Sequence, residues 1–288
     1  MRDLGICNLD LYITGHCNYQ CEYCYGEHDH CPDMTIDTYT KALAFAKHIG
    51  AQNVQLCGGE PLVCRHFKEF TLQAKENGLG VVLRTNGYYL PEYAEFIANN
   101  CVWVGVSLDG LPAANDLMRP AKANISAEEK FARPIEGIRK LKEANPEIRI
   151  ILASLASKCN SQHIPALAAY IRENQLPIDR WKIYEFICDK FRSVENKAKY
   201  EMSEADFKKL TEQMPATVNG AQIIFQSAHT ENVGANCLIV RQNGDIKLSG
   251  VHYGNILTDS FDDIVDKLVS GNVLTVISNN KKGTYGEQ

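Results

Sequence analysis

The chain has 288 residues, of which 45% are apolar and 23% are charged, and its formal net charge is −5. This composition is typical of a globular protein with one large or two small domains. It has no polybasic arm that would favour bulk nucleic-acid binding and no apolar run of the roughly 18 residues that a membrane span requires. The N-terminus also lacks the apolar core of a signal peptide, so we expect a cytoplasmic protein without a membrane partner.

Short apolar runs alternate with amphipathic segments of helical length over the first two thirds of the chain. This pattern predicts strands at residues 8–14, 53–57, 80–85, 102–107, 148–155 and 181–187. It predicts helices at 35–49, 66–77, 91–99, 127–144 and 162–174. Six such repeats indicate an α/β fold with parallel strands and right-handed crossovers. We therefore expect a partial (β/α)6, TIM-like barrel.

After residue 190 the rhythm changes. The pattern predicts a helix at 203–214, short strands at 223–225, 238–240 and 245–248, and a helix at 260–269. An Asn-Gly pair at residues 243–244 predicts a turn between the last two strands. The expected organisation is a barrel at 1–190, a short α+β C-terminal cap at 191–278, and a frayed tail at 279–288.

A cysteine motif with the spacing C-x3-C-x2-C follows the first predicted strand directly, at Cys17, Cys21 and Cys24. Three thiolates can hold three irons of a [4Fe–4S] cluster, which usually takes four, and so leave one iron open. S-adenosylmethionine fits such an iron through its amine and carboxylate. One electron from the cluster would then break its S–C bond and release a 5′-deoxyadenosyl radical.

The same cysteines allow two other interpretations. One is a structural zinc site in a non-catalytic binding protein, with a fourth ligand from His16, His28, His30 or Cys31. The other is a thioredoxin-like redox pair. The chain holds 11 cysteines, an odd number, which makes a secreted disulfide framework the least expected use of them.

Polar and glycine-rich motifs follow the next three predicted strands, where α/β barrels bind their ligands. The three motifs are Gly58-Gly59-Glu60-Pro61, Thr85-Asn86-Gly87 and Ser107-Leu108-Asp109-Gly110, and Arg119 follows the last of them. Each could be a plain turn or helix cap. Their joint occurrence on one face of the barrel favours a ligand site.

Together, these motifs and Tyr23 before the last cysteine resemble the radical S-adenosylmethionine (radical SAM) superfamily over about residues 8–190. The resemblance implies one [4Fe–4S] cluster on Cys17, Cys21 and Cys24, S-adenosylmethionine as cofactor, and an external one-electron donor such as flavodoxin or ferredoxin. It places Glu60 near the methionine amine and the backbone of Tyr23 near the adenine. The full set of implied cofactor contacts is Tyr23, Gly58, Gly59, Glu60, Thr85, Asn86, Ser107, Asp109, Arg119, Ser154 and Leu155.

The sixth predicted strand contains Arg180-Trp181-Lys182-Ile183-Tyr184, which resembles viperin-like members that act on a nucleoside triphosphate; the core also resembles MoaA-like members. Because side chains alternate along a strand, Lys182 and Tyr184 share one face. If that face lines the barrel, Lys182 is a candidate anion contact. The alternative is an ordinary strand whose lysine ends in solvent.

The C-terminal part resembles a reduced SPASM-type cap of peptide-modifying radical enzymes. After Cys188 the only cysteine is Cys237, so an auxiliary cluster is not expected. Cys237 could instead donate a hydrogen atom, as in epimerising members, or be a buried inert thiol. The sequence therefore leaves two substrate classes open: a nucleotide or other phosphorylated small molecule, and a ribosomally made peptide or natural product.

Overall fold

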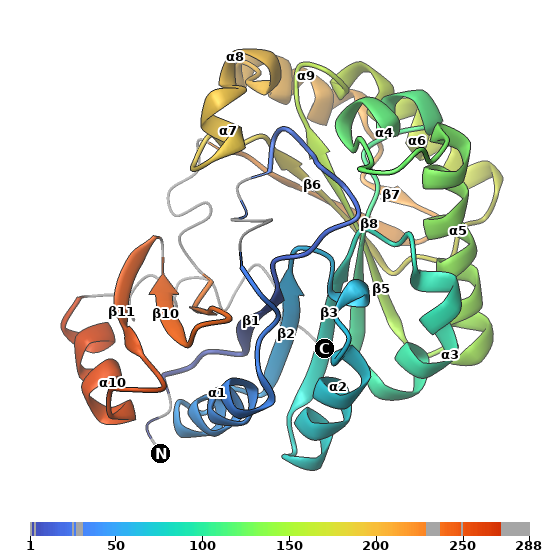
Figure 1. Ribbon diagram of the computed structural model, residues 1–288. Helices are drawn as coiled ribbons and strands as arrows, with labels where there is room; N and C mark the ends of the chain where they lie inside the picture. The colour runs from blue at the N-terminus through green and yellow to red at the C-terminus, as the bar shows by residue number, and fades with distance from the viewer. Residues whose placement is uncertain are drawn as a thin grey trace. The chain divides into compact units, whose positions relative to one another are not determined.

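The computed structural model describes residues 2, 4–24, 26, 31–228, 237–248 and 250–271. These residues belong to two compact units. Figure 1 labels many of the helices and strands that make them up. Unit 1 comprises residues 1–16, 28–83 and 231–288, and unit 2 comprises residues 17–27 and 84–230. Within the described part of the chain, no helix combines the length and the apolar character needed to cross a bilayer.

Unit 1 is built around parallel strands that follow one another in the chain. Its elements are β1 (Asn8–Thr14), α1 (Ile36–His48), β2 (Asn53–Gly58), η1 (Pro61–Val63), α2 (Phe67–Glu76), most of β3 (Gly80–Thr85), β9 (Ile239–Val240), β10 (Asp245–Leu248), β11 (Val251–Asn255) and α10 (Phe261–Ser270). Strand β2 pairs with β1 on one side and with β3 on the other, both in parallel.

The short C-terminal strands extend the sheet of unit 1. Strand β9 pairs in parallel with β1, on the side opposite β2, and β10 and β11 continue antiparallel. The predicted Asn-Gly turn is confirmed, because Gly244 has φ +86°, a conformation that favours glycine. Strand β11 was not predicted, and α10 follows it.

Unit 2 repeats the strand–helix alternation. Its elements are the end of β3, α3 (Leu90–Asn100), β4 (Trp103–Ser107), α4 (Pro112–Met118), α5 (Ala127–Ala144), β5 (Arg149–Ala156), η2 (Ser161–His163), α6 (Ile164–Glu173), β6 (Arg180–Glu185), α7 (Arg192–Glu195), α8 (Lys197–Tyr200), α9 (Glu204–Gln213), β7 (Thr217–Val218) and β8 (Ala221–Gln226). Strands β4, β5, β6 and β8 are parallel, and β7 is an antiparallel partner of β8.

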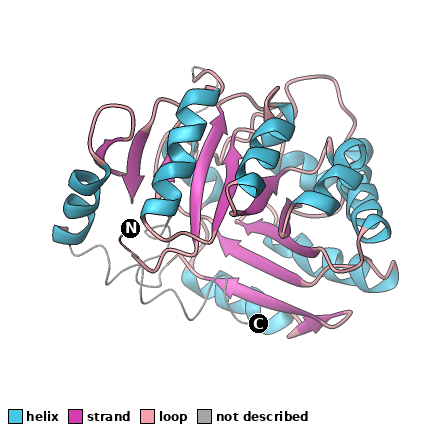
Figure 2. Cartoon of the chain, turned by 90° about the horizontal axis from the view of Figure 1, so that it is seen from below, coloured by secondary structure: helices cyan, strands magenta, loops and turns pink. Residues whose placement is uncertain are grey.

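The predicted helices form because each buries one apolar face, and all of them except α2 begin at a capping or proline residue. Thr35 caps α1 by accepting the Thr38 N–H, as its position before the helix predicts. Helices α3, α4 and α6 carry proline in their first turn. The helices run beside the strands that they connect (Figure 2). Three short helices, α4, α7 and α8, were not predicted, because they span too few residues to show a helical period.

Candidate cofactor site

The cysteine loop, residues 17–24, follows β1 in the sequence and carries the three predicted metal ligands. All three thiols are half-buried and free of disulfides. Main-chain amides approach two of the sulfurs: Tyr19 N–H donates to Cys17 Sγ at 3.4 Å, and Gly26 N–H donates to Cys24 Sγ at 3.4 Å. Such donors stabilise negative charge on sulfur and tune iron–sulfur clusters. The local arrangement therefore fits cluster ligands.

The Cys21 thiol lies between the other two in the sequence and is half-buried like them. Burial raises its pKa to about 11, and the positive charge of Arg119 opposes that shift. Because the thiolate is the metal ligand, metal binding must displace the Cys21 proton, and Arg119 makes this displacement easier.

No three His, Cys, Asp or Glu side chains among the described residues converge on a single metal-ion position. A cubane cluster does not require such convergence, because each cysteine binds a different iron. His28 and His30, two of the ligands considered for a zinc site, lie outside the described residues.

Backbone pairing holds the first half of the cysteine loop to the segment that follows α4. Tyr19 and Ala121 form an antiparallel bridge. Next to it, Gln20 N–H donates to the Pro120 carbonyl at 2.8 Å, and Lys122 N–H donates to the carbonyl of residue 18 at 2.9 Å. The loop is thus fixed by contacts that lie about a hundred residues away in the sequence.

The motif after β3 contributes a side-chain contact to the same loop. Asn86 is buried and donates from Nδ2 to Asn18 Oδ1 at 2.7 Å, while its own Oδ1 accepts the Tyr88 N–H at 3.0 Å. Thr85 is also buried, and its hydroxyl accepts the Gly87 N–H at 3.0 Å. The structure therefore brings Asn86 to the cysteine loop, whereas Thr85 shapes the turn itself.

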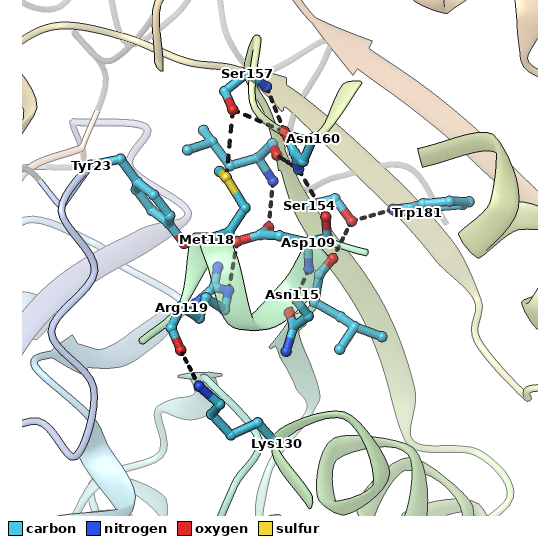
Figure 3. A network of polar contacts seen from close by, with 12 residues as sticks. Tyr23, Asp109, Asn115, Met118, Arg119, Lys130, Ser154, Ser157, Asn160 and Trp181 are labelled. Carbon is cyan, nitrogen blue, oxygen red and sulfur yellow. Dashed lines mark hydrogen bonds and ion pairs between the residues drawn. The ribbon is translucent and has the colours of Figure 1, made fainter. Parts of the chain in front are cut away.

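Asp109, at the end of the β4 motif, is the centre of a buried polar network (Figure 3). Its Oδ1 accepts the Leu155 N–H at 2.7 Å. Its Oδ2 accepts the Tyr23 hydroxyl at 2.8 Å and lies 2.7 Å from Arg119 Nε in an ion pair. Four predicted cofactor residues are thus in mutual contact.

The charges in this network are well defined. Burial lowers the pKa of Arg119, but its interactions with Asp109, Tyr23 and Cys21 together outweigh burial, and the pKa lies above its ordinary value. Burial raises the pKa of Tyr23 well above its ordinary value, and Asp109 adds to that shift. At neutral pH Arg119 is therefore a cation and the Tyr23 hydroxyl is a proton donor.

Asn160, which sequence analysis missed, completes the network. It is fully buried; its Nδ2 donates to the main-chain carbonyls of Asp109 at 2.8 Å and Leu155 at 2.7 Å, and its Oδ1 accepts the Ser157 N–H at 2.8 Å. The ends of β4 and β5 are thereby tied together. No sequence motif identifies Asn160, because the Asp109 carbonyl that it contacts lies 51 residues away in the sequence.

Strand register shows which residues of unit 2 share a face. Ser107 of β4 pairs with Ala153 of β5, and Ala153 pairs with Lys182 of β6. Neighbours paired in a parallel sheet project to the same side. Lys182 is 2% exposed, and Tyr184, opposite Leu155, is half-buried. The two predicted substrate residues thus lie on the face that carries Ser107.

Ser154 projects to the other face of the same sheet. Its hydroxyl donates to the Leu108 carbonyl and accepts the Trp181 Nε1–H, the latter at 2.9 Å (Figure 3). Both functions of the hydroxyl are therefore engaged within unit 2. The neighbouring Leu155 offers its main-chain N–H to Asp109 instead.

In unit 1, the Gly-Gly-Glu motif packs against the end of β1. Gly59 N–H donates to the Thr14 carbonyl, and Glu60 N–H donates to the His16 carbonyl, both at 2.8 Å. A Cβ on Gly59 would lie 2.1 Å from the His16 oxygen, and one on Gly58, whose φ is +121°, would lie 2.4 Å from the Thr14 oxygen. The two glycines thus permit close backbone contact within unit 1, while the buried Glu60 carboxylate caps η1 at 3.1 Å.

Cys237 is exposed and lies just before β9. Because Asp10 pairs with Ile239 in parallel, residue 237 is level with Asn8, the first residue of β1. The cysteine loop follows the other end of β1, beyond Thr14, which is about 20 Å further along at roughly 3.3 Å per residue. The prediction of a buried thiol is therefore wrong, and within unit 1 Cys237 lies at the end of β1 that is remote from Thr14.

We expect the Cys237→Ala variant to form 5′-deoxyadenosine and final product at the rates of the unchanged protein. The reason is that the thiol lies beside the first residue of β1, whereas the cysteine loop follows the last residue of that strand. Both compounds can be quantified by chromatography after anaerobic turnover. If the variant still cleaved S-adenosylmethionine but accumulated no product, Cys237 would be the hydrogen-atom donor.

A second set of contacts ties the cysteine loop to the helices after β6. The Glu22 carboxylate accepts the Tyr200 hydroxyl at 3.2 Å and forms an ion pair with Lys199, and the Glu22 carbonyl accepts Asn196 Nδ2 at 3.2 Å. The Tyr200 ring meets the Tyr23 ring edge-on, with centroids 5.8 Å apart. Sequence analysis missed Lys199 and Tyr200, because the short α8 gave no pattern.

Comparison with known proteins identifies the family. Residues 11–153 match the radical SAM superfamily model. The chain is 27% identical over 211 residues to an S-adenosylmethionine-dependent nucleotide dehydratase of Selenomonas ruminantium, covering 69% of this chain and 72% of that protein. It is 24% identical over 277 residues to a GTP 3′,8-cyclase of Helicobacter pylori, covering 90% of this chain and 84% of that protein.

Two solved structures share the fold. Streptococcus suis SuiB bound to its precursor peptide SuiA is 18% identical, with a TM-score of 0.72 over 94% of this chain and 67% of that chain. Native anSMEcpe with bound AdoMet and the Kp18Cys peptide is 16% identical, with a TM-score of 0.73 over 96% of this chain and 85% of that chain. The predicted partial barrel is thereby confirmed.

The chain belongs to the radical SAM superfamily and is an enzyme of that class. The cofactors of the class are a [4Fe–4S] cluster and S-adenosylmethionine. When bound, this pair supplies a 5′-deoxyadenosyl radical. Cys17, Cys21 and Cys24 are the residues that would hold the cluster, and main-chain amides donate to the sulfurs of Cys17 and Cys24.

Proposed function

We propose that this radical SAM enzyme removes hydrogen from a carbon of a nucleotide, with Lys182 as a contact to the substrate's phosphate groups. The main support is the position of Lys182, which is buried on the sheet face that carries Ser107, a predicted cofactor residue. Ala153 of β5 lies between the two residues, because it pairs with Ser107 of β4 on one side and with Lys182 of β6 on the other. An ammonium group on this face can donate a charge-assisted hydrogen bond to a substrate phosphate.

The relatives support the same substrate class. One is named a nucleotide dehydratase and the other a GTP cyclase, and this chain covers more than two thirds of each. Both names describe a nucleotide substrate. The chemistry requires that the substrate carbon be held close to the radical and away from water, which the protein must achieve by positioning.

Nucleotide use can be tested with anaerobically reconstituted protein, S-adenosylmethionine and dithionite. We expect one of the common ribonucleoside triphosphates to raise the rate of 5′-deoxyadenosine formation above the substrate-free rate. Flavodoxin or ferredoxin, the electron donors that we propose, should replace dithionite. If no nucleotide raised the rate, the other predicted class, a ribosomally made peptide, would become the better candidate.

The variant Lys182→Met tests the residue itself. Loss of one charge-assisted phosphate contact should raise the nucleotide concentration for half-maximal stimulation by about tenfold or more, while substrate-free cleavage persists. Lys140→Met is the matched control, since Lys140 is exposed on α5 and pairs with Glu136. Equal behaviour of the two variants would exclude Lys182 as a phosphate contact.

A further inference from the structure

One carboxylate joins two segments that the superfamily pattern places at the adenosine half of the cofactor. Asp109 is fully buried, and its two oxygens accept the Leu155 N–H at 2.7 Å and the Tyr23 hydroxyl at 2.8 Å (Figure 3). Leu155 belongs to the end of β5, and Tyr23 belongs to the cysteine loop.

The Asp109 carboxylate is engaged by three protein groups. Besides Leu155 and Tyr23, Arg119 Nε lies 2.7 Å from Oδ2. Its main chain is equally engaged, since its N–H donates to Asn115 Oδ1 at 3.0 Å and its carbonyl accepts Asn160 Nδ2 at 2.8 Å. Because both its side chain and its main chain are fixed by hydrogen bonds, Asp109 is suited to orient the residues that it contacts.

We propose that Asp109 is a positioning residue, which sets the cysteine loop in register with the end of β5 through the Tyr23 hydroxyl and the Leu155 N–H. Tyr23 stands between two cluster ligands, Cys21 and Cys24, so the angle of its ring fixes the loop backbone on either side. Asp109 thereby couples the placement of the cluster to the placement of the adenosine.

Contacts that do not involve the hydroxyl also hold the Tyr23 ring. The Tyr23 ring packs edge-on against Tyr200, and the Arg119 guanidinium carbon lies 5.7 Å from its centroid. These contacts can persist when the hydroxyl is removed, so Tyr23→Phe separates positioning from folding.

The inference depends on radical SAM chemistry alone and is independent of the nucleotide proposal.

The test compares the unchanged protein with Tyr23→Phe, both reconstituted with iron and sulfide without oxygen. The variant should retain about four irons per chain. Its dissociation constant for S-adenosylmethionine should rise by about tenfold, and the electron paramagnetic resonance spectrum of its reduced cluster should respond differently to S-adenosylmethionine. Asp109→Asn should do the same, and adding Tyr23→Phe to it should cause little further change, because the two act through one bond.

Tyr39→Phe is the matched control, since Tyr39 is fully buried and its hydroxyl donates to the Phe70 carbonyl at 2.9 Å. It should lower the unfolding midpoint and leave cofactor affinity and the spectrum unchanged. If Tyr23→Phe behaved like this control, the proposal would be overturned. Should Asp109→Asn not fold, Tyr23→Phe alone decides.

Discussion

Replacement of Cys21 by alanine is expected to abolish the cluster and, with it, the formation of 5′-deoxyadenosine. Three thiolates already leave one iron without a protein ligand, so loss of another leaves two of the four irons unheld. The anaerobically reconstituted variant should be colourless, with far fewer than about four irons per chain. Three independent measurements can check this. They are iron analysis, the visible absorption of the thiolate-bound iron, and chromatography of 5′-deoxyadenosine.

Cys7→Ala is the control for this experiment, because Cys7 is also half-buried and lies just before β1, with Sγ 3.5 Å from Gln52 Oε1. That variant should keep its colour, iron and activity. Undiminished 5′-deoxyadenosine formation by Cys21→Ala would show that the ligand assignment is wrong.

Replacement of Arg119 by methionine is expected to lower the free energy of unfolding by about 3–5 kcal/mol, because it leaves the Asp109 carboxylate buried beside no cation. The Arg119 side chain is 13% exposed and that of Asp109 is 0% exposed, so solvent does little to weaken the pair. Urea denaturation followed by tryptophan fluorescence suits the measurement, since both tryptophans, Trp103 and Trp181, lie in unit 2.

Two further variants separate the buried pair from a general charge effect. The double variant Arg119→Met with Asp109→Asn removes both charges, so it should lose less stability than the sum of the single variants. Arg133→Met breaks a pair with Glu92, which is 52% exposed, and should cost about 0–1 kcal/mol. A loss for Arg119→Met as small as that for Arg133→Met would show that the pair is hydrated.

Much of the barrel could be predicted because its signals are local. Apolar runs, helix caps and prolines mark β1 to β6 and the helices between them. The cysteine spacing and the motifs after β2, β3 and β4 are equally local, which is why they identified the superfamily and its cofactors.

The contacts inside the site could not be predicted, because they join residues far apart in the sequence. Asp109 meets Tyr23 across 86 positions and Leu155 across 46. Nor does a strand pattern show that the Ser154 hydroxyl is engaged by Trp181. The level of Cys237 beside β1 depends on the two-residue strand β9, whose pairing no local signal specifies.

Backbone pairing between the cysteine loop and the segment after α4 has a consequence for maturation. Gln20 and its neighbours cannot take up their arrangement until Pro120 and Lys122 have left the ribosome. At roughly 5–20 residues per second, the thiols of a nascent chain wait about 5–20 s for that segment. If iron were delivered earlier, the cysteine loop would still lack its contacts with residues 120–122. We therefore expect the metal to be inserted only after residues 1–122 have been synthesised.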